Sequence, residues 1–217
     1  MASKRGSKSS GSTPKPSVNL TVGIVGDGGV GKTCLLLAYL SGKCPAEYMP
    51  GPADWHSEYD HLTRHPVKLE QDGVQVSMNM VDTCGLDEYQ KLREKVCSSA
   101  DVFLLCFDVT SSASLERVRD QWIPEVKEYN SSAAFVLVAT KCDERIKAQM
   151  EGKPTSATVS FAQAKAAAQE MGAHTYCETS AKNKTGLKKV FEEAATAGVK
   201  NALPPKTGDE QNGCVVS

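Results

Sequence analysis

The sequence lacks the features of a membrane-spanning or secreted protein. No apolar run is long enough to cross a bilayer, and residues 1–16 are polar, so we expect neither a membrane helix nor a signal peptide. The formal net charge of −1 gives no reason to expect a nucleic-acid partner, and we expect none. The length of 217 residues is enough for one α/β domain with a sizeable core.

Cysteine is present, but without a spacing that binds zinc. The eight cysteines include no C-x-x-C pair, which argues against a structural zinc site. Most of them lie in apolar segments, and we interpret them as small, reduced hydrophobic residues, among them Cys34, Cys97, Cys106 and Cys177.

Residues 41–66 are predicted to form a long surface loop, because the segment is polar and contains glycine and several prolines. The loop contains His56, His61 and His65, whose spacing fits neither one face of a helix nor a known zinc pattern. We favour solvated loop histidines, with a metal site as the alternative.

Residues 26–33 read Gly-Asp-Gly-Gly-Val-Gly-Lys-Thr and fit the phosphate-binding pattern G-x-x-x-x-G-K-[ST]. Glycines allow the backbone to approach phosphate oxygens, and successive N–H groups form an anion-binding nest. Lys32 can reach the β- and γ-phosphates, and the Thr33 hydroxyl can bind Mg²⁺. A predicted buried strand at 18–25 and a predicted helix at 34–40 flank the motif. We therefore favour a phosphate site over a chance match in a glycine-rich turn.

A predicted β-hairpin leads to a second candidate metal ligand. Residues 67–70 and 74–81 alternate apolar and polar side chains, and the Asp72-Gly73 pair between them is typical of a tight turn. The second strand runs into Asp82, where a carboxylate facing the phosphate loop is expected to bind Mg²⁺. The D-x-x-G pattern ends at Gly85, whose backbone N–H is expected to lie against a γ-phosphate.

A candidate base-recognition motif follows the later strands. Buried strands are predicted at 101–107 and 134–139, with a helix at 112–129 between them that Pro124 should bend. The second of these strands ends in Thr140-Lys141-Cys142-Asp143. The Asp143 carboxylate can accept hydrogen bonds from both the N1–H and the N2–H₂ groups of guanine, a donor pair that adenine lacks. The Lys141 side chain can lie along the face of the base.

The remaining segments complete the α/β pattern. After a polar segment at 144–157, Ser160 is predicted to cap a helix at 161–171, followed by a strand at 175–177 and a helix at 185–199. Residues 1–17 are predicted to be a disordered basic tail, and we favour a solvated tail over one attracted to an anionic membrane. Residues 201–217 are predicted to be a second flexible tail.

Together these motifs resemble the Ras superfamily of small GTPases, and its Rho branch in particular. The matching letters are GDGGVGKTCLL, DTCGLDEY, ADVFLLCFDVTSSASLERVRDQWIPEVKEY, TKCD, and CETSAK followed by GLKKVFEEA. The resemblance covers residues 18–200. It implies an α/β P-loop NTPase fold, a six-stranded, mostly parallel sheet with helices on both faces and the nucleotide at the carboxyl ends of the strands.

The resemblance also implies ligands and partners. GTP or GDP would bind with Mg²⁺ at Thr33 and Asp82, and effectors with exchange or activating factors would be the protein partners. The Ala181 N–H would contact O6 of guanine. The residues implied to bind nucleotide are Asp27, Gly28, Gly29, Val30, Gly31, Lys32, Thr33, Cys34, Gly85, Lys141, Asp143, Ser180, Ala181 and Lys182.

The last four residues, Cys214-Val-Val-Ser, match the C-a-a-X prenylation pattern, and the final Ser favours farnesyl on Cys214. Only isolated lysines precede this box, and a single lipid chain holds a protein on a membrane weakly. We therefore expect a cytoplasmic protein that associates reversibly with the cytoplasmic face of membranes, the plasma membrane in particular.

Three positions depart from the Rho pattern. Gly51 stands where the first switch has a Thr that completes the Mg²⁺ shell, and Cys44 stands where an aromatic residue contacts guanine. Leu86 stands where a Gln orients the attacking water, so no catalytic residue is assigned. Thr63 is the alternative source of the missing hydroxyl.

We therefore expect a Rho-like signalling switch that hydrolyses GTP slowly and is mostly GTP-loaded, by resemblance in actin or polarity pathways. The alternative is a guanine-nucleotide-binding interaction module that hydrolyses nothing. A third hypothesis, an ATPase or nucleoside kinase, conflicts with the guanine pattern at 140–143.

Overall fold

A computed structural model of the chain describes residues 15–44, 63–152 and 158–203. Most of the loop at 41–66 and most of both predicted tails lie outside these ranges. No helix within them is both long and apolar enough to cross a membrane.

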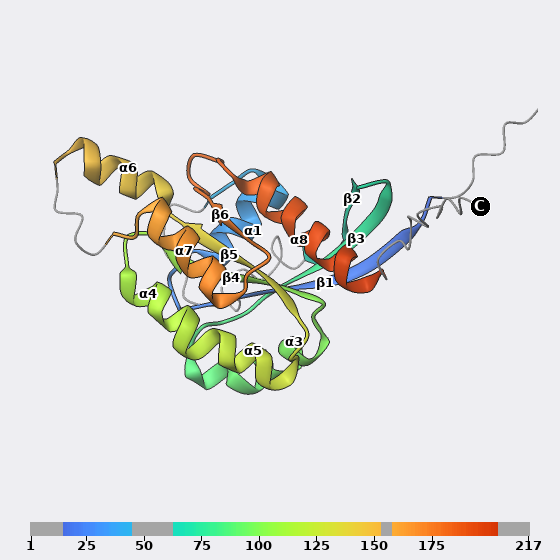
Figure 1. Ribbon diagram of the computed structural model, residues 1–217. Helices are drawn as coiled ribbons and strands as arrows, with labels where there is room; N and C mark the ends of the chain where they lie inside the picture. Colours follow the sequence, from blue (N-terminus) through green and yellow to red (C-terminus); the bar gives the residue numbers. More distant parts are fainter. Residues whose placement is uncertain (1–14, 45–62, 153–157, 204–217) are drawn as a thin grey trace, which may run out of the picture.

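A six-stranded sheet in the order β2-β3-β1-β4-β5-β6 forms the centre of the molecule (Figure 1). Only β2 runs antiparallel to its neighbour, whereas the other pairings are parallel, so the predicted six-stranded, mostly parallel sheet is confirmed. The strands are β1 Ser17–Gly26, β2 Val67–Gln71, β3 Val74–Asp82, β4 Val102–Asp108, β5 Ala134–Thr140 and β6 Thr175–Glu178.

The predicted hairpin joins β2 to β3. Asp72 and Gly73 both have positive φ, 51° and 80°, which is the backbone of a type I′ turn and matches the twist of the two strands. Next to this turn, the Pro16 carbonyl accepts a hydrogen bond from the Gln75 N–H, and Lys15 pairs with Glu70 at 2.7 Å. The sheet therefore holds the chain from residue 15 onward.

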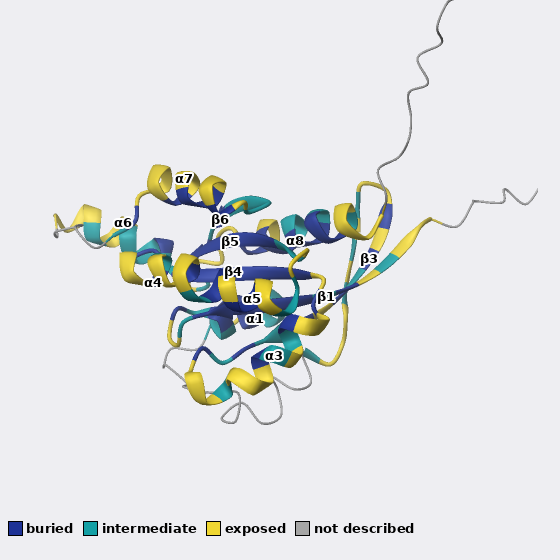
Figure 2. Cartoon of the chain, turned by 60° about the horizontal axis from the view of Figure 1, so that its bottom comes forward, coloured by how far each residue is buried: buried dark blue, intermediate teal, exposed yellow. Residues whose placement is uncertain are grey.

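Helices cover both faces of the sheet (Figure 2). Helices α1 and α8 pack on one face, and α3, α4, α5 and α7 pack on the other, which leaves β4 and β5 almost wholly buried. The helices are α1 Lys32–Ser41, α3 Gln90–Ser99, α4 Ser112–Arg117, α5 Ile123–Tyr129, α6 Cys142–Met150, α7 Phe161–Met171 and α8 Leu187–Ala202, with a 3₁₀ turn η2 at Asp87–Tyr89.

The predicted helix at 112–129 contains a π-helical turn, η3, at Val118–Trp122 between α4 and α5. The Ile123 N–H bonds to the carbonyl of Val118, five residues earlier, and Pro124 follows at the start of α5. A proline lacks the N–H of the next α-helical bond, and the wider turn lies just ahead of that interruption. The structure thus has a π-turn just before Pro124, where the sequence predicted a bend.

The polar segment expected at 144–157 begins as a helix, because α6 runs from Cys142 to Met150. Asp143 therefore lies in the first turn of a helix. The predicted cap at Ser160 is confirmed: its Oγ accepts from the Gln163 N–H, and the Gln163 side chain accepts from the Ser160 N–H, a capping box.

Candidate nucleotide-binding site

The phosphate-binding motif forms the turn between β1 and α1, as its sequence predicts. Lys32 is buried, and its Nζ donates to the carbonyls of Gly26 and Asp27, each at 2.7 Å. Burial lowers the pKa of Lys32, while the Asp82 carboxylate opposes that shift. The ammonium group is therefore held under the loop by the loop's own backbone.

Thr33 and Asp82 are brought together from α1 and the end of β3. The Thr33 hydroxyl donates to Asp82 Oδ2 at 2.6 Å, and Asp82 Oδ1 is buried. A hydroxyl and a carboxylate are hard oxygen ligands of the kind that Mg²⁺ prefers. The donor set therefore fits the metal that the sequence implies at these two residues.

Gly85 packs directly against the phosphate loop. A Cβ at Gly85 would lie 2.3 Å from the Gly26 carbonyl oxygen and 2.5 Å from the Gly28 nitrogen, so no side chain fits there. The next side chain, Leu86, lies beside Gly28 and is 44% exposed. An apolar group without a donor or acceptor thus occupies the position where the Rho pattern has the Gln that orients the attacking water.

A buried ion pair that sequence reasoning missed holds this segment in place. Arg93 Nη1 donates to the carbonyls of Cys84 and Leu86 at 2.9 and 2.6 Å, and its Nε donates to Glu125 at 2.7 Å. Arg93 is 2% exposed and Glu125 9%. In the sequence, the only sign of this pair is that Arg93 and Glu125 fall on the buried sides of their helices, α3 and α5.

The loop is also anchored through Asp27. Its Oδ1 accepts a hydrogen bond from Trp122 Nε1 at 2.7 Å and forms an ion pair with Arg117 at 3.1 Å. Arg93 lies over the Trp122 ring, 5.1 Å from its centroid. One connected set of side chains therefore joins the phosphate loop, the segment around Gly85 and the helices beside them.

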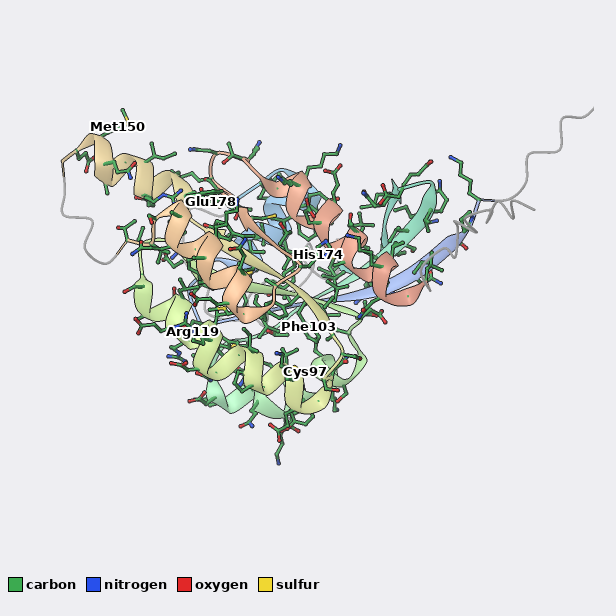
Figure 3. The ribbon with its side chains drawn as sticks, viewed as in Figure 1. Cys97, Phe103, Arg119, Met150, His174 and Glu178 are labelled. Carbon is green, nitrogen blue, oxygen red and sulfur yellow. The ribbon has the colours of Figure 1, made fainter. Side chains whose placement is uncertain are left out.

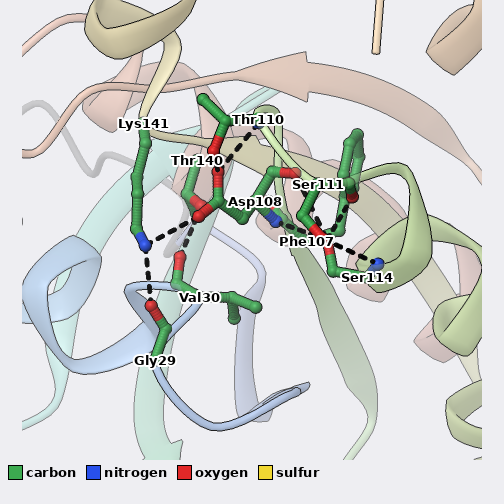
Figure 4. Close-up of polar contacts among 9 residues, drawn as sticks. All are labelled: Gly29, Val30, Phe107, Asp108, Thr110, Ser111, Ser114, Thr140 and Lys141. Carbon is green, nitrogen blue, oxygen red and sulfur yellow. Dashed lines mark hydrogen bonds and ion pairs between the residues drawn. The ribbon is translucent and has the colours of Figure 1, made fainter. Parts of the chain in front are cut away.

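The Lys141 motif also contacts the phosphate loop (Figure 4). Lys141 Nζ donates to the Gly29 carbonyl at 2.8 Å and to Asp108 Oδ2 at 2.7 Å. The Thr140 hydroxyl lies within hydrogen-bond distance of the carbonyls of Val30 and Phe107, and its single proton is donated to one of them at a time. Asp108, a residue that sequence reasoning did not single out, thus orients the predicted base-contacting lysine.

The other residues predicted to contact the base lie at the start of α6 and in the segment that follows β6. The Cys142 N–H donates to the Thr179 carbonyl at 3.1 Å, which ties the start of α6 to the segment containing Ser180, Ala181 and Lys182. Ser180 is buried, and its backbone pairs with Thr185 in an isolated β-bridge. Lys182 reaches back to Glu144 at 3.4 Å. The structure therefore brings the two predicted base-binding segments side by side.

The described cysteines are all free thiols, as expected. Burial is the largest influence on Cys34 and raises the pKa of its thiol to about 11, with a hydrogen bond to Cys44 acting in the same direction. Among the described residues, no group of three or more His, Cys, Asp and Glu side chains forms a metal site.

Several predicted residues fall outside the described ranges: Gly51, His56, His61 and Cys214. Thr63 and His65 are described, and Thr63 is half-buried just before β2.

Comparison with models of known protein families shows what the chain is similar to. The family model of the Ras family matches residues 21–200, from β1 into α8.

Proposed function

Because the chain belongs to the Ras family, whose members bind and hydrolyse GTP, we propose that it is an atypical, Rho-like switch that hydrolyses GTP slowly. The match covers nearly all of the described chain. Proteins of the Ras family in general bind guanine nucleotide and Mg²⁺. The Rho-like character, the slow hydrolysis and the roles of single residues are the proposal.

In the proposed mechanism the chain binds and orients the phosphates. The N–H groups of the loop from Gly28 to Thr33 bind phosphate oxygens, and Lys32 supplies a positive charge beneath them. Thr33 and Asp82 would hold Mg²⁺, which neutralises charge that develops on the β- and γ-phosphates. Gly85 lies close enough to the loop to present its N–H to a γ-phosphate.

The base would be recognised by Asp143 and Ala181. The Asp143 carboxylate accepts from guanine, and the Ala181 N–H donates to its O6. Support comes from the ion pair of Lys141 with Asp108 and from the Cys142–Thr179 hydrogen bond, which hold both segments in one place.

The position of Leu86 is the observation that carries slow hydrolysis. It lies beside Gly28, next to the predicted γ-phosphate site, and it cannot hold a water molecule. Groups that position a nucleophile typically contribute on the order of 10²–10⁴ in rate. A chain with leucine here is expected to retain nucleotide binding and to lose most of the chemical step.

The test is single-turnover GTP hydrolysis by the wild type and by Leu86→Gln. The substitution should raise the rate by at least roughly tenfold, because it restores a group that can orient water. Leu92→Gln is the matched control, since Leu92 is also an exposed leucine, 58% exposed, but lies on α3, outside the D-x-x-G segment and the position that follows it. Equal rates for all three proteins, at the pace of an ordinary Rho protein, would contradict the proposal.

The second candidate function is a guanine-nucleotide-binding module that hydrolyses nothing. The same leucine favours it, together with Gly51 at the predicted switch position. The hydrolysis assay separates the two functions. If the wild type binds GTP without turnover, and Leu86→Gln shows no turnover either, the protein is such a module.

Slow hydrolysis has a consequence for loading and partners. Cys44 removes a predicted aromatic contact to the base, which should speed nucleotide release. A protein that exchanges readily and hydrolyses slowly would be mostly GTP-bound, since GTP normally exceeds GDP in cells, and would engage effector proteins without an exchange factor. Prenylation at Cys214 would bring it reversibly to the cytoplasmic face of membranes.

A further inference from the structure

The Arg145 side chain connects three segments beside the proposed base site. Arg145 lies in α6, two residues after Asp143. Its Nη2 donates to Glu178 Oε2 at the end of β6, and its Nη1 donates to the Val159 carbonyl at 3.0 Å, just before α7. The side chains are 11% and 22% exposed, so most of this ion pair is shielded from water.

The Glu178 carboxylate is fixed through both of its oxygens. While Arg145 holds Oε2, the Tyr176 hydroxyl donates to Oε1 at 2.7 Å. Charge-assisted bonds of this kind are short and directional, so the carboxylate has little freedom to turn. Figure 3 labels Glu178, the last residue of β6.

The ion pair spans the two segments that carry the proposed guanine contacts. Asp143 precedes Arg145 in the first turn of α6, and Ala181 follows Glu178 by three residues. The backbone links these segments through Thr179, whose carbonyl accepts from the Cys142 N–H and whose N–H donates to the carbonyl of Ala139 at the end of β5. Two ion pairs add side-chain ties: the exposed Lys182–Glu144 pair at 3.4 Å, and the Arg145–Glu178 pair, which is the better shielded from water of the two.

We infer that Arg145 and Glu178 are positioning residues that fix the spacing between the Asp143 carboxylate and the Ala181 N–H. They thereby set the preference for guanine over a base that lacks the 2-amino group. The inference rests on the proposed guanine site and adds the residues that make it selective. The physical reason is that a polar contact misplaced by about 1 Å loses much of its effect.

The experiment measures the affinities of the full chain for GDP and for IDP, whose base lacks the 2-amino group. The wild type should prefer GDP by about tenfold to 150-fold, the worth of a hydrogen bond to a carboxylate. Arg145→Met and Glu178→Gln should each lower that preference by about fivefold or more. The double variant should lose no more than either single variant, because both residues act as one unit.

Two further variants sharpen the comparison. Arg145→Lys keeps the charge, but a single ammonium lacks the planar fork that serves two acceptors, so its preference should be intermediate. Arg119→Met is the matched control. Its ion pair with Glu170, at 3.3 Å, is exposed and lies well away from Glu178 (Figure 3), so the ratio of the two affinities should stay at the wild-type value.

The possible outcomes distinguish this inference from the proposed guanine site on which it rests. A merely structural role would lower thermal stability and leave the GDP-to-IDP ratio unchanged in Arg145→Met and Glu178→Gln, and that result would overturn the inference. If Arg145→Met does not fold, Glu178→Gln and Arg145→Lys decide the same question. A wild type that binds neither nucleotide, or both equally, would instead overturn the proposed guanine site.

Discussion

Trp122 and Asp27 are 95 positions apart in the chain, and Trp122 Nε1 donates a hydrogen bond to Asp27 Oδ1 at 2.7 Å. The tryptophan is fully buried in the layer of helices beside the sheet, and the aspartate is part of the phosphate loop. The shape of that loop is therefore held by a side chain from another element.

Replacing Trp122 with Phe should loosen the loop. The variant loses a hydrogen bond to a carboxylate, worth about 1.5–3 kcal/mol, and release of bound nucleotide should become faster. Urea unfolding would measure the loss of stability, and the decay of fluorescence from a labelled GDP would measure release.

Asp27→Asn serves as its control. The amide keeps an acceptor for Trp122 but loses the ion pair with Arg117, whose side chain is 49% exposed, so the effect on stability should be small. The idea would be wrong if Trp122→Phe released nucleotide no faster than Asp27→Asn.

The buried pair of Arg93 and Glu125 should be costly to break. Glu125→Leu would leave the Arg93 guanidinium without its carboxylate in a buried place, and we expect a loss of about 3–5 kcal/mol in the free energy of unfolding. Because Arg93 also holds the carbonyls beside Gly85, hydrogen exchange at residues 84–86 should rise as well.

An exposed pair gives the comparison for that result. Lys188 and Glu192 form an i, i+4 pair on α8 at 3.0 Å, with 84% and 41% of their side chains exposed, and Glu192→Leu should cost less than about 0.5 kcal/mol. Similar losses at both sites would show that burial does not govern the strength of these pairs.

Cys44→Phe should slow nucleotide release. It restores an aromatic contact to the base, worth about 0.5–1.5 kcal/mol, which corresponds to a few-fold to tenfold slower release. Stopped-flow measurement of labelled GDP would show the change. Cys44→Ser keeps the small size and adds no ring, so its rate should stay near that of the wild type; slowing by both substitutions would point to the lost thiol contact with Cys34 instead.

Cellular protein should carry a prenyl group on Cys214. Mass analysis of the C-terminal peptide would show the added lipid, and Cys214→Ser would remove it and shift the protein to the cytosol. Only part of the wild type should sediment with membranes, since one chain binds weakly. An unmodified Cys214 in the wild type would contradict this prediction.

The sequence was sufficient for the order of the elements and for the contiguous motifs. Alternating and unbroken apolar runs predicted the strands, and the spacing from Gly26 to Thr33 predicted a turn between β1 and α1. The Asp72-Gly73 pair predicted the hairpin. Each of these signals is local, so a single stretch of chain contains all of it.

The missed features are pairs whose partners lie far apart in the chain. Arg93 with Glu125, Asp108 with Lys141, and Arg145 with Glu178 meet only after the sheet has assembled. Trp122 is a buried core residue, and its hydrogen bond to Asp27 depends on the same assembly. The π-turn was missed because the helix was predicted from apolar residues at α-helical spacing, and that spacing does not show one extra residue within a turn.

That π-turn determines which way its side chains face. Successive residues of an α-helix are about 100° apart around the axis, so one surplus residue in a turn rotates everything after it by a comparable angle. Deleting one residue between Val118 and Gln121 would restore an ordinary helix and swing Trp122 away from Asp27 and toward solvent. Such a shortened chain would keep its helix content while the phosphate loop lost its tether, so circular dichroism would record no difference between two proteins that hold nucleotide very differently.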